Sequence, residues 1–207
     1  MIKELVVATR NKKKLEEIKY MLKDLNFMIT SLADYDNLPK IIEDGLTFKE
    51  NAIKKSATIA QYLGKFTLGE DSGLEVEALG NRPGVYSARY SGKNSTDRRN
   101  NQKLLKELAK VPLKKRKAKY TCSVAVCDSH GLLGVFEGTC RGIIASRERG
   151  QFGFGYDPIF LIPKYNKTFG ELGEGIKHKM SHRYKAFVKV RNFILGLDRQ
   201  RLNPQHL

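Results

Sequence analysis

Two adjacent carboxylates lie in the segment LGEDSG, residues 68–73. Glu70 and Asp71 follow a short apolar approach, and a second apolar run from Leu74 to Leu79 comes after them. In a chain of formal net charge +16, an acidic pair at what reads as the end of a strand is an unusual surface feature. Carboxylates suit a hard cation such as Mg²⁺, and one of them can take a proton from water. The segment therefore predicts a metal centre or a general base.

Lysines crowd the first turn of the first predicted helix, which begins Asn11-Lys12-Lys13-Lys14. A helix N-terminus carries a partial positive charge and unsatisfied N–H groups, so three lysines there are locally unfavourable. A docked anion would remove the conflict. We expect the loop from Ala8 to Asn11 to wrap a phosphate, with a merely solvated basic helix start as the alternative. The P-loop pattern GxxxxGK[ST] is absent.

The same conflict recurs near residue 180. The start of the last predicted helix is surrounded by five basic side chains: Lys177, His178, Lys179, His182 and Arg183. A solvated basic surface would also explain this second cluster. Two such clusters with an acidic pair between them in the sequence favour a phosphorylated substrate that binds together with a metal.

Two further segments complete the candidate site. Glu43 precedes the second long helix and, with Asp71, could supply two oxygen ligands while waters and phosphate complete an octahedron. For Glu43 the alternative is ordinary helix N-terminal electrostatics. In the stiff turn GFGYDP, residues 153–158, Phe154 could stack on a nucleobase and Asp157 could accept a base N–H. A structural turn with a buried Phe and a capping Asp is the alternative.

Apolar periodicity predicts the elements that position these residues. The helices expected are residues 11–25, 47–63, a segment from Ser95 or Thr96 to about 108, and a last one from 181; the strands are 2–8, 27–32, 66–68, 119–128 and 132–138. Thr47 and Glu50 fit a capping box, and Gly64 ends that helix. Strands that alternate with helices, followed by a hairpin, predict an α/β fold with a mixed sheet.

Composition narrows the class of protein. The 207 residues fit one domain, or one domain with two lobes, and 41% hydrophobic with 29% charged residues is ordinary for a soluble chain. No apolar run approaches the ~18 residues that span a membrane, and the N-terminus does not read as a signal peptide. Three cysteines without a CxxC pair predict reduced thiols in a cytoplasmic protein. The basic run 114–119 is either a solvated connection or a nucleic-acid contact.

Together the segments resemble one family, the inosine triphosphate pyrophosphatases, which remove noncanonical purine nucleoside triphosphates. The resemblance rests on ATRNKKK (8–14), EDGLTFKENAIKKS (43–56), EDSGLEVEALGNRPGVYSARYSG (70–92), FGFGYDPIF (152–160) and KHKMSHRYKA (177–186). These stretches occur in the family's order over nearly the whole chain. The resemblance implies a single domain over residues 1–207, with an elongated two-lobed α/β fold around a long mixed sheet flanked by helices. It also implies a homodimer.

The resemblance implies Mg²⁺-dependent hydrolysis of ITP, dITP and XTP to the monophosphate and pyrophosphate. Asp71 would be the proton acceptor and, with Glu43, would bind Mg²⁺. Substrate would be bound by Thr9, Arg10, Asn11, Lys12, Lys13, Lys14, Lys55, Ser72, Phe154, Gly155, Tyr156, Asp157, Lys177, His182 and Arg183. Of these, Phe154 to Asp157 with Lys177, His182 and Arg183 would form the base pocket. No membrane and no specific nucleic-acid partner are expected.

This chain departs from the family pattern at four positions. Arg10 and Lys13 stand where glycine is frequent, and a backbone that needed φ > 0 there would be strained. Phe152 also replaces a common glycine and is expected to narrow the pocket, and Glu70 replaces the first Asp of the frequent DDSG. Two alternatives stay open: a Maf-like nucleotide pyrophosphatase, and a nucleic-acid-binding protein argued from the net charge.

Overall fold

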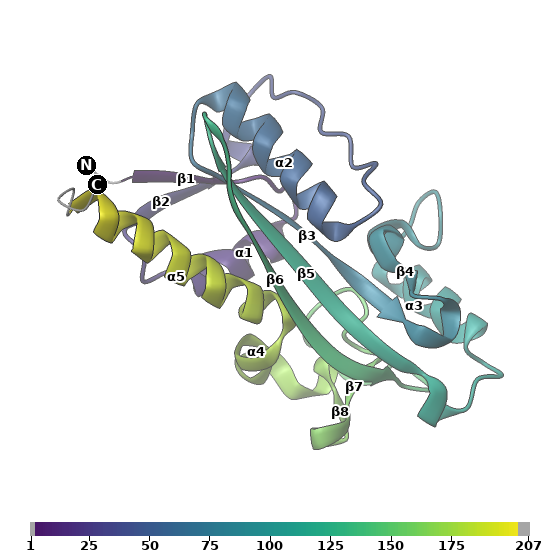
Figure 1. Cartoon of the computed structure of the whole chain (residues 1–207). Helices are drawn as coiled ribbons and strands as arrows, with labels where there is room; N and C mark the ends of the chain where they lie inside the picture. The colour runs from purple at the N-terminus through teal and green to yellow at the C-terminus, as the bar shows by residue number, and fades with distance from the viewer. Residues whose placement is uncertain (1–2, 203–207) are drawn as a thin grey trace.

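The computed structural model describes residues 3–202, with no side-chain description for 198–202. Within that range eight strands form one mixed sheet (Figure 1). Its strands are β1 (Lys3–Val7), β2 (Phe27–Ser31), β3 (Thr67–Val76), β4 (Arg82–Pro83), β5 (Lys117–Asp128), β6 (Gly131–Ile144), β7 (Phe160–Ile162) and β8 (Lys167–Thr168). The order is β2-β1-β3-β5-β6-β7-β8, and β4 pairs with β3. The first three strands in this order are parallel and the others pair antiparallel, so the predicted mixed α/β sheet is confirmed.

Helices cover both faces of this sheet. They are α1 (Lys12–Met21), α2 (Phe48–Leu63), α3 (Asp97–Glu107), α4 (Phe169–Met180) and α5 (His182–Leu202). Helix α2 packs on β3 and β5, whereas α5 packs on β5 and β6 from the other side (Figure 1). Among the described residues, no helix has the length and apolar character needed to cross a membrane.

Strand β3 has an open edge in its middle. It pairs with β1 only at Thr67 and Leu68, and with β4 only at Glu75 and Val76. Residues 69–74 therefore pair with a neighbouring strand on one side alone, with β5. The buried core also changes there, since Leu68 belongs to a cluster with α1 and α5 and Leu74 to a second cluster with α3 and β7. The acidic segment lies at the junction of the two clusters.

The structure corrects three sequence expectations. Segment 70–73 lies inside a ten-residue strand, not at a strand end. The first helix ends at Met21 rather than near 25, because Leu22 caps it and Leu25 fills the core from the following turn. Strands β4, β7 and β8 and helix α4 had not been predicted. Of the first predicted strand, residue 2 lies outside the described residues.

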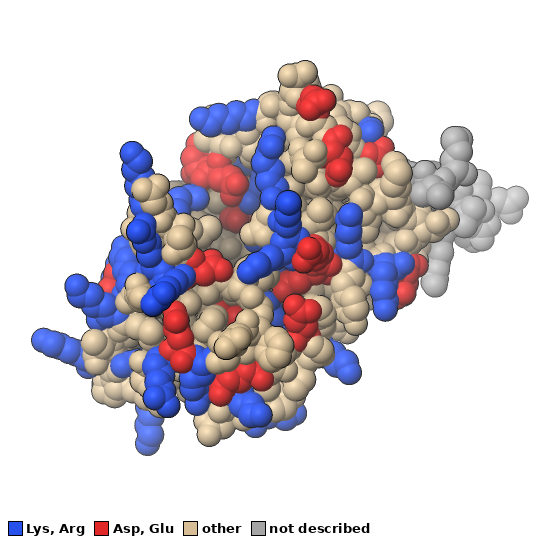
Figure 2. All heavy atoms as spheres, turned by 180° about the vertical axis from the view of Figure 1, so that it is seen from behind, with Lys and Arg blue, Asp and Glu red and all other residues tan. Residues whose placement is uncertain are grey.

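The remaining predicted elements agree within a few residues, except that β6 continues to Ile144, beyond the predicted end at 138. Thr47 caps α2 as expected, although Glu50 accepts its hydrogen bond from the N–H of Leu46 rather than from Thr47. Gly64 ends α2 with φ +65°. The cysteines are free. On the face that Figure 2 shows, many basic side chains project from the end of the molecule far from the chain termini.

Candidate functional site

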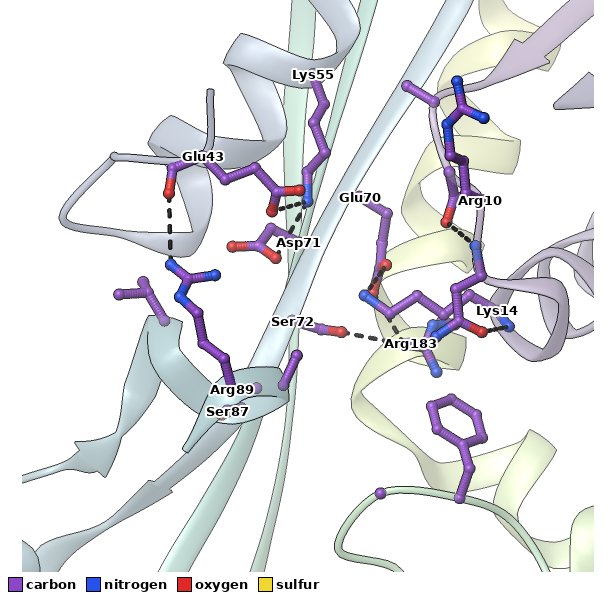
Figure 3. A pocket seen from close by; sticks show the side chains of 18 of the residues that line it. Arg10, Lys14, Glu43, Lys55, Glu70, Asp71, Ser72, Ser87, Arg89 and Arg183 are labelled. Carbon is purple, nitrogen blue, oxygen red and sulfur yellow. Dashed lines mark hydrogen bonds and ion pairs between the residues drawn. The ribbon is translucent and has the colours of Figure 1, made fainter. Parts of the chain in front are cut away.

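A cavity of about 700 Å³ opens along the free edge of β3. Its walls come from the β1–α1 loop, the loop before α2, the middle of β3, the glycine-rich loop and the start of α5. Because successive side chains of a strand point to opposite faces, Glu70 and Asp71 face different walls (Figure 3). The open edge lets one cavity reach both of them. Glu70 therefore contacts one cluster of residues and Asp71 contacts another.

On the α2 side of β3, one lysine joins two carboxylates. Lys55 Nζ lies 2.8 Å from Glu43 Oε2 and 3.2 Å from Asp71 Oδ1. The amide of Asn51 donates to Asp71 Oδ2 at 3.2 Å. Glu43 and Asp71 come from distant segments, as the sequence predicted, and their carboxylates converge on one cation position (Figure 3).

Burial and charge set the ionisation of this cluster. Burial raises the pKa of Asp71, and the positive charges of Lys55 and Lys14 only partly offset the effect. Burial alone would lower the pKa of Lys55, but the charges of Asp71 and Glu43 outweigh it and raise that pKa. Asp71 is thus a carboxylate with an elevated proton affinity next to an ammonium that stays charged.

Helix α2 reaches this position because Gly69 lets it lie directly on β3. A Cβ at Gly69 would lie 2.2 Å from the carbonyl oxygen of Ala52 and 2.6 Å from the nitrogen of Ser56. Backbone atoms cannot yield to such a contact as a flexible side chain could. The absent side chain therefore fixes the distance between Lys55 on the helix and Asp71 on the strand.

The donor set of this cluster fits Mg²⁺. Glu43 and Asp71 bring hard carboxylate oxygens to one region of the cavity, where both contact the ammonium of Lys55. No group of three or more His, Cys, Asp or Glu side chains gathers as metal ligands within residues 3–202. Two carboxylates suit a cation that keeps several waters and takes its other ligands from a phosphate.

On the opposite face of β3, Glu70 is enclosed by cations. Its Oε2 lies 2.8 Å from Lys14 Nζ and its Oε1 lies 3.0 Å from Arg183 Nη2. Burial would raise the pKa of Glu70, but the charges of Arg183 and Lys14 outweigh it and hold the pKa well below the usual range. Arg183 Nη2 also donates to Ser72 Oγ at 3.0 Å. Glu70 is thus a permanent counter-ion that positions Lys14 and Arg183.

Glu17 is a site residue that the sequence did not reveal. Its carboxylate bonds Lys177 Nζ at 2.8 Å and Arg183 Nη1 at 2.5 Å. It thereby ties α1 to both cations of the predicted base pocket. Its partners lie more than 150 positions later in the sequence, so no local sequence pattern could have predicted these contacts. The one available signal is its place three residues after Lys14, on the same face of α1.

The glycine-rich loop is held by Asp157, which is 2% exposed. Its carboxylate accepts from Lys177 Nζ at 2.8 Å and from the N–H of Phe154 at 2.9 Å. A Cβ at Gly153, where φ is +77°, would lie 2.1 Å from that carboxylate. The loop presents the half-buried Phe154, with Lys177 4.6 Å and Arg183 5.5 Å from the ring centroid. Asp157 orders the loop in addition to lining the cavity.

His182 closes the same end of the cavity. Its ring stacks on Tyr120 with centroids 4.5 Å apart and planes 10° apart. Burial and the charges of Arg183 and Lys177 hold the pKa of His182 well below its usual value, so the imidazole is neutral. Among the described residues, its buried Nδ1 and the Nε of Arg183 have no hydrogen-bond partner. Two unsatisfied buried nitrogens suit a polar ligand at this end.

The loop before α1 forms the wall next to Glu70. Asn11 caps the helix by accepting from the N–H of Lys14 at 3.2 Å, and Thr9 Oγ1 accepts from the N–H of Asn11 at 3.1 Å. Arg10 and Lys13 are not among the residues with positive φ, so their replacement of glycine does not strain the backbone. The lysine-rich turn remains free of acids, as a site for an anion requires.

The cavity brings together most of the predicted site residues. Its walls include Thr9, Arg10, Asn11, Lys14, Glu43, Lys55, Asp71, Ser72, Phe154, Gly155, Tyr156, Asp157, Lys177, His182 and Arg183. The structure places Lys12 and Lys13 outside this lining, although Lys13 Nζ is 6.0 Å from the Phe154 ring. The expectation that Phe152 narrows the pocket is wrong, since this side chain is 58% exposed and does not line it.

The chain is similar to known proteins over most of its length. It is 45% identical over 194 residues to the dITP/XTP pyrophosphatase of Shouchella clausii, covering 94% of this chain and 98% of that protein. With the dITP/XTP pyrophosphatase of Geobacter sulfurreducens it shares 46% identity over 190 residues, 92% of this chain and 96% of the relative.

Solved structures agree with this similarity. The HAM1 protein of Coxiella burnetii superposes with a TM-score of 0.86 at 37% identity, covering 94% of this chain and 99% of its own. The Ham1 protein of Staphylococcus aureus gives a TM-score of 0.85 at 39% identity with the same coverage. The profile of the Ham1 family matches residues 5–193. The resemblance drawn from the motifs is therefore confirmed, and this chain belongs to the Ham1 family.

Proposed function

We propose that this protein hydrolyses dITP, ITP and XTP to the monophosphate and pyrophosphate. The names of the relatives in Shouchella clausii and Geobacter sulfurreducens support it. The observation that carries the proposal is the arrangement of charge along the cavity. On the α2 side of β3 the cavity holds the carboxylates of Glu43 and Asp71 with Lys55, and at its other end it holds the buried cation Lys177. A nucleoside triphosphate has the matching parts, a polyanionic chain for Lys14 and Lys55, which line the cavity, and a polar base for the buried cationic end.

The proposed reaction is attack of water on the α-phosphorus, with pyrophosphate as the leaving group. Asp71 accepts the proton of that water, a role that its raised pKa suits. Lys55 and Lys14 hold the phosphate oxygens and neutralise the charge that develops on them. We further propose that Mg²⁺ is bound by Glu43 and Asp71. When bound, it supplies additional positive charge to the phosphate chain.

Selectivity for the base is proposed to lie at the other end of the cavity. The base stacks on Phe154, and its 6-oxo group accepts a hydrogen bond from Lys177 or Arg183. Both cations are held by Glu17, so they cannot withdraw readily when a base with a 6-amino group enters. Adenine would place donors against donors, and an unpaired buried polar group is costly enough to reject a substrate strongly.

A panel of nucleotides tests the proposal. The protein is incubated with ITP, dITP, XTP, GTP and ATP in the presence of Mg²⁺, and pyrophosphate is measured separately from phosphate. We expect pyrophosphate release with a preference of at least about tenfold for the 6-oxo substrates ITP and XTP over ATP. Release of single phosphates, or equal turnover of ITP and ATP, would contradict the proposal.

Two further features belong to the same proposal. We propose a homodimer, supported by large apolar side chains exposed on the loop before α2 and on the 3-10 helix η3 (Gly84–Arg89), namely Ile42, Leu46 and Tyr86. Arg89 connects the two segments by donating to the carbonyl of Glu43 at 3.4 Å.

We also propose a cytoplasmic location, since Cys122, Cys127 and Cys140 are free and buried, as in a reducing compartment.

A further inference from the structure

More than half of the net positive charge of this protein is concentrated in one segment. Residues 93–119, here called the basic segment, hold eleven lysines and arginines against the two acids Asp97 and Glu107. The segment has a net charge of +9, whereas the other 180 residues share +7. It comprises α3, the 3-10 helix η4 (Leu113–Lys115) and the start of β5. These elements lie at the end of the molecule far from the chain termini (Figures 1 and 2).

Helix α3 arranges part of this charge as a stripe. Its cations and the one just beyond it follow the spacing 4-3-4, which places them along one face: Arg99, Lys103, Lys106 and Lys110. All four are exposed, and the opposite face is buried through Asn100 and Leu104. With a pitch of 5.4 Å, the stripe presents one cation about every turn.

The two acids of the segment are already engaged. Asp97 accepts from the N–H of Gly155 at 2.8 Å, which ties α3 to the glycine-rich loop. Glu107 accepts from the hydroxyl of Tyr90 and pairs with Arg82 at 3.4 Å. Several exposed cations of the segment have no ion pair among residues 3–197, whose side chains the structure describes: Lys93, Arg98, Arg99, Lys106, Lys110, Lys114, Lys115 and Lys117.

A buried arginine holds the second half of the segment in place. Arg116 is 8% exposed and donates to the carbonyls of Val111 at 2.8 Å and Ala145 at 3.3 Å. It fixes η4 against the end of β6, so that Lys114, Lys115 and Lys117 project from an ordered connection. The cations are therefore a fixed array and not a loose tail.

We propose that the basic segment binds the phosphate backbone of duplex nucleic acid without reading its sequence. A duplex carries about one negative charge per 1.7 Å of axis, and neutralising it releases counter-ions. Binding of this kind is compatible with the expectation that no sequence-specific nucleic-acid partner exists.

The composition of the segment favours a duplex over other polyanions. Residues 93–119 contain no Phe, Tyr or Trp, whereas proteins that bind single strands stack unpaired bases on aromatic side chains. A lipid surface would gain most of its affinity from apolar side chains that insert between headgroups, in addition to electrostatic attraction. Leu113 is the one large hydrophobic side chain of this segment that is strongly exposed in the described structure.

Fluorescence anisotropy with a labelled duplex of arbitrary sequence, about 24 base pairs long, tests the proposal. We expect micromolar affinity at 50 mM salt and a slope of log K against log salt of about −3 to −5, which corresponds to roughly four or five phosphate contacts. The variant Lys110→Glu/Lys114→Glu/Lys115→Glu is expected to lose at least about tenfold in affinity. These three lysines lie outside the helices α1 to α5, so no α-helix is weakened.

A matched control variant distinguishes an effect of the basic segment from an effect of the net charge of the protein. The variant Lys19→Glu/Lys23→Glu/Lys49→Glu changes the net charge equally, at exposed positions of α1, the turn after it and α2. It should bind duplex within about twofold of the wild type if the contact is local. Equal loss in both variants, tighter binding of a single strand or of anionic lipid vesicles than of the duplex, or no salt dependence would overturn the proposal.

Nucleotide hydrolysis by the first variant provides an independent readout. Lys110, Lys114 and Lys115 do not line the cavity, so kcat/KM for ITP should equal that of the wild type. A fall in kcat/KM at low salt with unchanged duplex binding would show instead that the segment steers the substrate, and would overturn the proposal. Duplex binding does not depend on the proposed hydrolase function, so the two proposals fail separately.

Discussion

At the scale of single residues, adjacent acids have different tasks because a strand alternates its faces. Asp71 faces Lys55 and Glu43, and burial raises its pKa. Glu70 faces Lys14 and Arg183, whose charges keep its pKa low in spite of burial. One carboxylate has a high proton affinity and the other is a fixed counter-ion. The sequence singled out Asp71, but only the pairing of β3 shows why Glu70 cannot replace it.

Replacing Asp71 by Asn should remove most of the turnover. The amide keeps the shape and can still bond Asn51, but it can neither accept a proton nor bind a cation strongly. We expect kcat for ITP to fall about 10²- to 10⁴-fold, with an unfolding midpoint close to that of the wild type. Asp44→Asn is the matched control, since Asp44 is exposed beside Glu43 and pairs only with Lys54. Wild-type rates in Asp71→Asn would remove Asp71 from the mechanism.

The pH profile should report the raised pKa of Asp71. Only the ionised carboxylate can accept a proton, so activity is present above this pKa and is lost as pH falls through it. Because the pKa is raised, the acid limb of kcat/KM should lie above the value of about 3.9 for an ordinary Asp. A bound cation competes with the proton. Raising the Mg²⁺ concentration should therefore move the limb to lower pH, and a limb that does not respond to Mg²⁺ would contradict the metal assignment.

At the scale of elements, α1 links the two ends of the cavity. Its N-terminus contributes Lys14 to Glu70, and one turn later Glu17 holds Lys177 and Arg183. A displacement of this helix would disturb the phosphate wall and the base wall together. The element is therefore as important to the site as β3, although the sequence shows only its basic first turn.

Glu17→Gln tests this role of α1. The amide leaves two buried cations with less negative charge around them, which should lower stability by about 1.5–3 kcal/mol. We expect kcat/KM for ITP to fall mainly through KM, because we propose that Lys177 and Arg183 contact the base and not the reacting phosphate. Glu16→Gln is the control at the neighbouring exposed position. If both variants behave as the wild type in calorimetry and kinetics, Glu17 does not position the base pocket.

The contact between α2 and β3 can be tested at Gly69. An alanine there must push the α2 backbone away from the strand, since its Cβ would lie 2.2 Å from the carbonyl oxygen of Ala52. Overpacking of this kind costs about 1–3 kcal/mol, and it also separates Lys55 from Asp71. We expect both a lower Tm and a lower kcat. Gly175→Ala, whose added Cβ would meet no atom within 4 Å outside its own helix, should leave kcat unchanged and should not lower Tm.

At the scale of the whole molecule, the strongly periodic segments could be predicted from the sequence. The spacing of Leu15, Ile18 and Leu22 shows α1, and Thr47 with Gly64 marks the ends of α2. The region from 160 to 180 could not be predicted, because β7 and β8 have only three and two residues and α4 contains three glycines. Those short elements become ordered through tertiary contacts.

The residues of the candidate site also divide into those that could be predicted from the sequence and those that could not. Residues in unusual local patterns, such as Asp71 or the lysines 12–14, could be found from the sequence. Glu17 could not, because its role depends on partners that fold back from α4 and α5. The open edge of β3 is likewise invisible locally, since it results from where β1 and β4 stop pairing.

We expect the proposed homodimer to depend on two exposed apolar side chains, Leu46 and Tyr86. Leu46 is 85% exposed and Tyr86 is 58% exposed, although both are large apolar side chains on segments joined through Arg89. Removing that area from water would stabilise association, so Leu46→Asp with Tyr86→Asp should convert a dimer into a monomer in analytical ultracentrifugation. Leu132→Asp, at a 49% exposed hairpin position, is the control and should leave the dimer intact. A wild-type protein that sediments as a monomer at micromolar concentration, or a double variant that remains dimeric, would contradict this assignment of the interface.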